Sequence, residues 1–106
     1  MPESKALIPS RNKIINAVCN YYNIDEDELY KTKRGITNEP RNVSIYLTRR
    51  LRKDSLNEIG KQYKIEKYSS VSSILERVKK LMKEDSTLAK HIDEVSSNIT
   101  KSQKQT

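Results

Sequence analysis

The stretch that decides the fold is SLNEIGKQYKIEKYSSVSSILERVKKLMK, residues 55–83. Ser55 and Glu58 have the spacing of a capping box, which predicts the start of a helix of about nine residues. After a connector at residues 64–67, apolar residues at helical spacing predict a longer helix from about 69 to 83. The residues expected to face inward from this longer helix are Val71, Ile74, Leu75, Val78, Leu81 and Met82. A short capped helix, a tight connector and a longer helix form a helix-turn-helix pattern.

Apolar residues recur at helical spacing through the rest of the 106-residue chain, and Asn-Gly and Asp-Gly hairpin turns are absent. Further helices are predicted at about 10–22, 25–30, 38–53 and 86–99, with Ser10, Asp25, Asn38 and Ser86 at their starts. The sequence therefore predicts an all-α fold, a compact bundle of about five to six helices that contains the helix-turn-helix. We expect a flexible lead at 1–9, one helical domain at 10–99 and a disordered tail at 100–106.

The positive charge is concentrated in the middle of the chain. Lys and Arg total 21 and Asp and Glu total 14, which gives a net charge of +7. Residues 31–53 contain eight bases and one acid, so this stretch alone accounts for the whole excess. Such a basic stretch is typical of nucleic-acid binders, because neutralisation of phosphates dominates their affinity. A charged surface that serves only solubility remains the alternative.

Several classes of function are excluded by composition. The chain has one cysteine, Cys19, and one histidine, His91, too few for a disulfide or a tetrahedral zinc site. Its two glycines cannot build a phosphate-binding loop. No apolar run reaches the roughly 18 residues that a membrane span needs. We therefore expect no enzyme, cofactor, metal, small-molecule substrate or membrane partner, with Cys19 in the core and His91 on the surface of a cytoplasmic, monomeric protein.

Exposed polar residues at the start of the longer helix are the candidates for reading DNA bases. In a helix-turn-helix the second helix enters the major groove and its first residues reach the base edges. The candidates are Lys67, Tyr68, Ser69, Ser70 and Ser73. Helix capping and ordinary solvent exposure would explain one or two of the serines, but not four hydroxyls on its first turns. The basic loop KTKRGIT, residues 31–37, is expected to be exposed and able to follow a groove, or else to be a solvated connector.

Residues 34–81, RGITNEPRNVSIYLTRRLRKDSLNEIGKQYKIEKYSSVSSILERVKKL, resemble the C-terminal DNA-binding domain of the bacterial replication initiator DnaA. The likeness runs from about Ile14 to Ile99. Its most specific parts are the pair Pro40-Arg41, the run SLNEIG at 55–60 and the aromatic residue Tyr63. The resemblance is closer still to the DnaA-like domain that follows the catalytic region of REP-associated transposases, where motifs similar to NEPRNVSIYLTRRL at 38–51 and YSSVSSILERV at 68–78 also occur. The resemblance implies a DnaA C-terminal, TrpR-like fold.

The resemblance also implies roles for basic residues. Lys33 and Arg34 would enter the minor groove, and Arg41 and Arg49 would hold phosphates. Asn42 and Arg77 are further candidate phosphate contacts.

One stretch departs from the DnaA pattern. Where DnaA has Gly-Gly-Arg-Asp-His-Thr-Thr, this chain has KIEKYSS at 64–70. The donor Lys67 replaces the acceptor Asp of the DnaA pattern, which changes the base edges that can be satisfied. The connector must also be built without glycine.

The predicted function is sequence-specific binding of double-stranded DNA. The chain would be the DNA-binding module of a bacterial protein related to replication initiators or to transposases, associated with the nucleoid. The alternative is a basic interaction module that binds structured RNA or an acidic protein.

Overall fold

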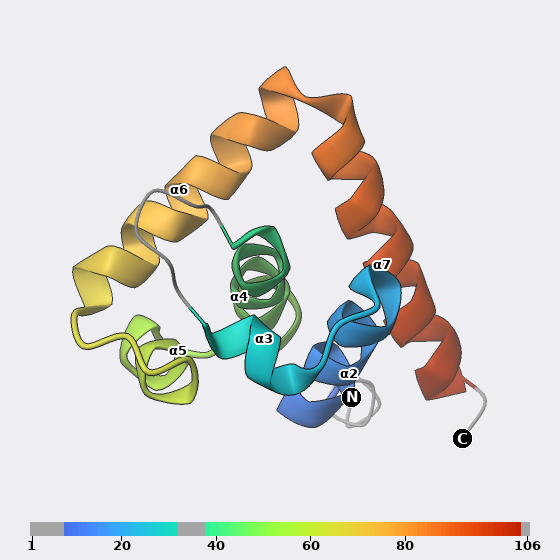
Figure 1. The fold of residues 1–106 in the computed structure, drawn as a ribbon, viewed down its shortest axis with the longest axis horizontal. Coiled ribbons are helices and arrows are strands. Elements are labelled where there is room, and N and C mark those ends of the chain that lie inside the picture. Colours follow the sequence, from blue (N-terminus) through green and yellow to red (C-terminus); the bar gives the residue numbers. More distant parts are fainter. Residues whose placement is uncertain (1–7, 32–37, 105–106) are drawn as a thin grey trace, which may run out of the picture.

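The computed structural model describes residues 8–31 and 38–104. In these two ranges the chain forms six α-helices and no strand (Figure 1). The helices are α2 (Arg11–Tyr22), α3 (Glu26–Tyr30), α4 (Glu39–Arg52), α5 (Leu56–Gln62), α6 (Tyr68–Glu84) and α7 (Ser86–Lys104). The predicted all-α fold is confirmed, and each predicted helix is present with bounds that shift by one or two residues at most, except at the end of α7.

Side chains that cap the helices set where they begin. The Ser10 hydroxyl accepts the N–H of Lys13 at 3.1 Å, and the Asn38 side chain accepts the N–H of Arg41 at 3.0 Å. Both halves of the predicted capping box at α5 are formed by Ser55 and Glu58. Asp25 occupies the N-cap position of α3 as predicted, but its side chain makes no capping hydrogen bond.

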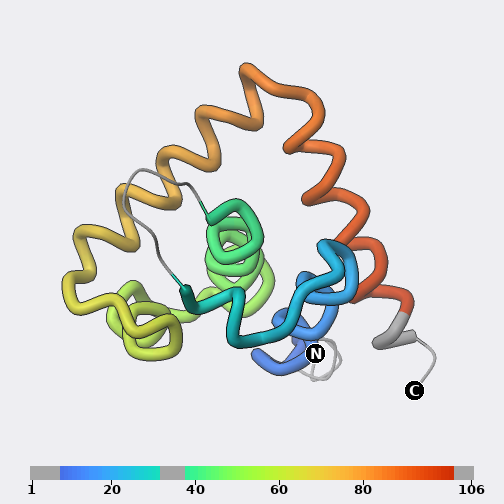
Figure 2. The backbone as a smooth tube through the Cα atoms, in the orientation of Figure 1, coloured from blue at the N-terminus to red at the C-terminus, as the bar shows by residue number. Residues whose placement is uncertain are grey.

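Helix α4 lies at the centre of the fold, where it packs against all five other helices (Figure 1). Helices α6 and α7 form two long sides that meet at a sharp corner, as the backbone trace in Figure 2 shows. Asp85 is the one residue between them. Helix α5 packs against the first part of α6, and α2 packs against α7. The helix-turn-helix formed by α5 and α6 is therefore attached to the rest of the domain through α4 and α7.

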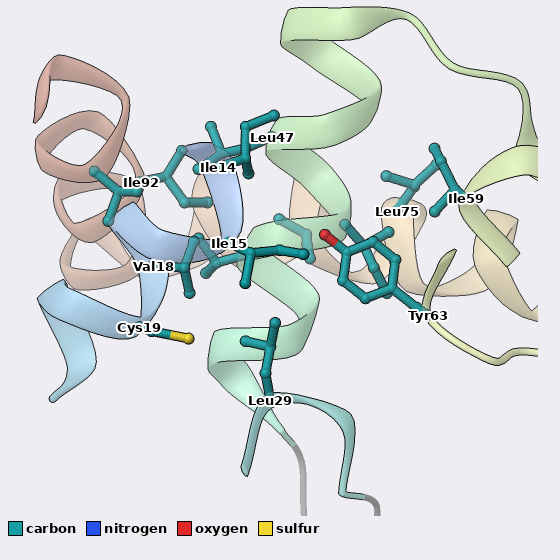
Figure 3. Close-up of a cluster of buried hydrophobic side chains, with 14 of the residues drawn as sticks. Ile14, Ile15, Val18, Cys19, Leu29, Leu47, Ile59, Tyr63, Leu75 and Ile92 are labelled. Atoms are coloured by element: carbon teal, nitrogen blue, oxygen red, sulfur yellow. The ribbon is translucent and has the colours of Figure 1, made fainter. Parts of the chain in front are cut away.

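One apolar core joins all six helices, and part of it is drawn in Figure 3. Its buried members are Ile14, Ile15, Val18, Cys19, Leu29, Val43, Ile45, Leu47, Ile59, Tyr63, Val71, Leu75, Val78, Leu88, Ile92, Val95 and Ile99. Cys19 thus lies in the core as expected. Leu81 was predicted to face inward, but its side chain is 36% exposed. At about 100° per residue Leu81 lies roughly 90° from the centre of the stripe that buries Val71, Leu75 and Val78.

Helix α7 continues to Lys104. Residues 100–104, which the sequence assigned to a disordered tail, are therefore helical. Ile99 is the last buried residue of α7. Extending an existing helix costs little once it has formed, and the Lys, Ser and Gln that follow have no strong preference against helix.

Candidate nucleic-acid interface

The connector between α5 and α6 is a tight turn closed by its own backbone. The N–H of Ile65 donates to the carbonyl of Gly60 at 2.8 Å. A Cβ atom at Gly60 would lie 2.9 Å from the Ile65 carbonyl oxygen, so only glycine fits this approach without a shift of backbone. Lys64, at the position of a glycine in the DnaA pattern that the sequence resembles, takes a left-handed conformation with φ 60°. The turn is thus built without a glycine at the position of positive φ.

Tyr63 holds this turn against α4. Its ring is 2% exposed, and its hydroxyl contacts the hydroxyls of Ser44 and Thr48, the latter at 3.1 Å. Thr48 Oγ1 in turn donates to the Ser44 carbonyl at 2.8 Å. Burial raises the pKa of the Tyr63 hydroxyl, and the hydrogen bonds to Ser44 and Thr48 only partly oppose this. A satisfied polar cluster therefore fixes the helix-turn-helix relative to α4.

Asp54 holds the junction between α4 and α5 to the start of α2. Its side chain is 8% exposed, and its Oδ2 accepts Nε of Arg11 and Nε of Arg52, each at 3.0 Å. Arg49 Nη1 donates to the Asp54 carbonyl at 2.7 Å, and Arg52 Nη1 donates to the Pro9 carbonyl at 2.8 Å. Burial by itself would raise the pKa of Asp54, but the hydrogen bonds and charges of Arg52 and Arg11 lower it overall.

The five candidate base readers come together on the first turns of α6 and all are exposed. They are Lys67, Tyr68, Ser69, Ser70 and Ser73. Tyr68 is 62% exposed, the largest exposure recorded for a big apolar or aromatic side chain among the described residues. The N-cap position is Lys67, which makes no side-chain cap, so none of these serines caps the helix. The capping explanation of the serines therefore does not hold.

The four candidate phosphate contacts differ in accessibility. Arg77 is exposed on α6, and Arg49 is exposed at the end of α4. Arg41 is half-buried, its Nε is enclosed without a partner among the described residues, and burial lowers its pKa. Asn42 is only 7% exposed, so its prediction as a phosphate contact is not supported by its position. It is the fourth residue beyond the N-cap Asn38, at a point where residues 42–45 are all buried and α4 is covered on every side.

The predicted minor-groove residues Lys33 and Arg34 lie outside the described residues. Of the loop at 31–37, only Lys31 is described, and its Nζ lies 3.2 Å from Glu28 Oε1.

His91 was expected on the surface, but it is half-buried at a junction of three helices. Its Nδ1 lies 3.2 Å from Glu39 Oε2, and the Tyr22 hydroxyl donates to the same oxygen at 2.7 Å. The His91 ring also lies 5.6 Å from the ring of Tyr21. Burial, and then the bond to Glu39, raise the pKa of Tyr22 well above its ordinary value. The junction joins α2, α4 and α7, and Glu39 at the start of α4 is its shared acceptor.

Sequence reasoning missed the role of Asp54. The available signal was that Asp54 is the only acidic residue between Glu39 and Glu58, in a stretch rich in arginine. An isolated acid among several bases indicates an ion pair, but the partner Arg11 lies 43 residues away in the chain. Nothing in the local pattern identifies that partner.

No helix in the described ranges has the length and apolarity needed to cross a membrane. Among the same residues, no three His, Cys, Asp or Glu side chains lie close enough together to hold a metal ion.

A protein-family model described as "Bacterial dnaA protein helix-turn-helix" matches residues 11–78 of the chain. The match begins with the first residue of α2 and ends at Val78 in α6. It covers well over half of the chain and includes α5, the turn and the first turns of α6. The last turns of α6 and all of α7 lie beyond it.

Proposed function

The chain belongs to the bacterial DnaA helix-turn-helix family, and on that basis we propose that it binds double-stranded DNA in a sequence-specific manner. Helix α6 enters the major groove and α5 crosses the backbone beside it. The single observation that carries the proposal is the exposure of all five candidate base readers on the first turns of α6. Because Tyr63 is bonded to α4 and the close approach of Gly60 to Ile65 fixes the turn before α6, the readers meet the DNA already oriented.

Base readout rests on hydroxyl and ammonium groups. The serines at 69, 70 and 73 can each donate and accept a hydrogen bond, so they can satisfy several base edges at close range. Lys67 donates only, and its best partners in the major groove are O6 and N7 of guanine. The ring of Tyr68 offers apolar contact to a thymine methyl. The preferred site therefore differs from the one read by relatives with Asp and His at these two positions.

Phosphate contacts supply most of the affinity. We assign this role to Arg77 and Arg49, which are exposed, and to the Nη nitrogens of Arg41, since its Nε is enclosed. Lys33 and Arg34 are assigned to the minor groove from the family resemblance. Asn42 is left out of this set because it is buried.

We propose that the chain serves as the DNA-binding module of a replication initiator-like or transposase-related protein at the bacterial nucleoid. Alone it is monomeric, and it has no catalytic activity of its own.

The experiment that tests this function is selection of binding sites from random duplex DNA. Wild-type protein is expected to enrich a defined motif. The double variant Ser69→Ala/Ser70→Ala is expected to change the motif, because base-edge partners are lost. Neutralising Lys33 and Arg34 is expected to weaken binding to all sequences. Ser97→Ala, an exposed serine on α7, is the matched control and should enrich the wild-type motif.

Two results would contradict the proposal. One is the absence of any enriched motif with wild-type protein. The other is tighter binding to single-stranded or hairpin RNA than to duplex DNA, which would replace the proposed function with RNA binding.

A further inference from the structure

A groove runs between α4 and α6, beside the helix-turn-helix. At its α5 end it has a volume of about 410 Å³ and combines an apolar floor with a basic rim. The floor is formed by Tyr46, Leu56 and Leu75, and the rim includes Arg50 and Lys79. Tyr46 and Leu56 are only half-buried, so part of their apolar surface is open to a ligand.

The groove continues along α6 toward the end of that helix. A second hollow of about 430 Å³ shares Tyr46, Glu76 and Lys79 with the first, so the two form one continuous surface. The extension adds the half-buried Met82 to the floor and Lys83 to the rim. We call the combined surface the α4–α6 groove.

The α4–α6 groove is strongly cationic. Its charged residues are Arg49, Arg50, Lys79, Lys80 and Lys83, against the single acid Glu76. All six are exposed. Arg49 already donates through Nη1 to the Asp54 carbonyl, so Arg50 and Lys79 are the rim groups best able to pair with a ligand. Aromatic and arginine side chains are also the types most often found at the centre of protein interfaces.

The groove-lining residues of α6 adjoin the base readers on the helix surface. A helix turns by about 100° per residue, so residues three or four apart are neighbours on one face. Ser72, Glu76 and Lys79 line the groove. Ser69 and Ser73 each lie three residues before one of them, so the groove borders the surface that the base readers form.

DNA itself is a poor occupant of this surface. A phosphate backbone can pair with the basic rim, but its deoxyribose carbons, flanked by charged phosphates, offer little apolar surface to cover the floor. A hollow of this size is filled by a few side chains rather than by the outside of a duplex. An apolar floor with a basic rim favours a ligand that has apolar side chains flanked by carboxylates.

We propose that the α4–α6 groove docks an acidic amphipathic segment of a partner protein. Its apolar side chains would cover Tyr46, Leu56 and Leu75, and its carboxylates would pair with Arg50 and Lys79. This interaction goes beyond DNA binding, and it can be measured without DNA. It would allow the domain to recruit or be held by a second protein.

The test uses the full chain and a synthetic peptide as the probe. The peptide has about 15 residues, with leucines at helical spacing along one face and glutamates elsewhere, and its scrambled form is the control. Fluorescence anisotropy is expected to show binding at least about tenfold tighter than that of the scrambled peptide. The double variant Arg50→Glu/Lys79→Glu is expected to weaken it about tenfold or more. The double variant Lys90→Glu/Lys101→Glu makes the same change in net charge on α7 and should leave the dissociation constant within about twofold.

Four outcomes overturn the proposal. The peptide fails to bind below about 1 mM. The scrambled peptide binds as tightly, which indicates charge attraction alone. The two double variants weaken binding equally. In the fourth outcome, the groove variant reduces affinity for duplex DNA more than the α7 variant does, while peptide binding is unchanged. This result would assign the groove to the DNA backbone. None of these outcomes contradicts the proposed DNA binding, because DNA binding is measured separately with duplex DNA.

Discussion

The hydroxyl of Tyr63, at the end of α5, lies 3.1 Å from Oγ1 of Thr48 on α4 and also contacts the hydroxyl of Ser44. This buried contact joins the helix-turn-helix to the helix that carries Arg41 and Arg49. The candidate base readers and the candidate phosphate contacts are therefore held in one rigid frame. Substitutions of single residues test that frame and the charges around it.

Tyr63→Phe removes one hydroxyl and leaves that of Ser44 without its partner in the core. We expect a loss of about 1–2 kcal/mol in the free energy of unfolding, because a buried polar group left unpaired keeps its desolvation cost. Urea denaturation measures it. Tyr68→Phe, at an exposed position, is the control and should change stability by less than about 0.5 kcal/mol. Equal stability of Tyr63→Phe and wild type would show that the cluster contributes nothing.

Gly60→Ala introduces a Cβ atom 2.9 Å from the Ile65 carbonyl oxygen. Alanine is the better helix former by about 1 kcal/mol, but the clash is with backbone and must move the turn, so we expect a net loss of about 1–3 kcal/mol. Thermal unfolding measures the change. Asn57→Ala, exposed in the same helix, is the matched control for helix propensity and should be neutral or slightly stabilising. A more stable Gly60→Ala would mean that the turn can relax.

Lys53→Gly is expected to stabilise the protein by about 0.5–1 kcal/mol, since Lys53 has φ 59° and glycine adopts this conformation without strain. Lys64→Gly relieves the same strain at φ 60°, but it gives up the contact of Lys64 Nζ with the Tyr30 ring at 5.6 Å. That contact contributes about 0.5–1 kcal/mol, so the net gain at Lys64 should be close to zero. Lys53→Ala keeps the strain and should bring no gain. Chemical denaturation of the three variants decides between these outcomes.

Acid is expected to weaken the junction at Asp54. The folded pKa of Asp54 lies below its unfolded value near 3.8, so the stability that it contributes is present above about pH 4 and is lost as the pH falls through the folded pKa. Asp54→Asn should lower stability at neutral pH by about 1–3 kcal/mol and flatten the dependence on pH below 4. Denaturation curves from pH 7 to pH 2 measure both effects. A parallel loss in wild type and variant would place the acid sensitivity elsewhere.

Arg77→Ala should reduce the slope of log affinity against log salt concentration by about 1, because one phosphate contact is lost. Asn42→Ala should leave this slope unchanged, because Asn42 is buried and its replacement should affect the stability of α4 instead. Titration of a duplex at several salt concentrations gives both slopes. If Asn42→Ala also gives a smaller slope, the result would show that Asn42 contacts a phosphate in spite of its burial.

The helices and their caps were predictable because their signals are local. The capping box of Ser55 and Glu58, the N-caps Ser10 and Asn38, and the periodic stripes each lie within one or two turns of chain. The exposure of the candidate base readers followed from the same periodicity.

What the sequence did not predict depends on contacts between distant segments or on the exact rotation of a helix. Asp54 pairs with Arg11 across 43 residues, and His91 meets Glu39 across 52. Asn42 lies where the central helix α4 is covered on every side, since residues 42–45 are all buried. Leu81 sits at the margin of its apolar stripe, where a small rotation decides whether a side chain is covered. Neither kind of information is present in local spacing.

Asp54 also has a consequence for how this family can diverge. One carboxylate neutralises arginines from two separate helices, so replacing it alone leaves two partly covered cations facing each other. Related proteins should therefore change positions 11, 52 and 54 together, and an aligned set of relatives would show the three drifting as a unit.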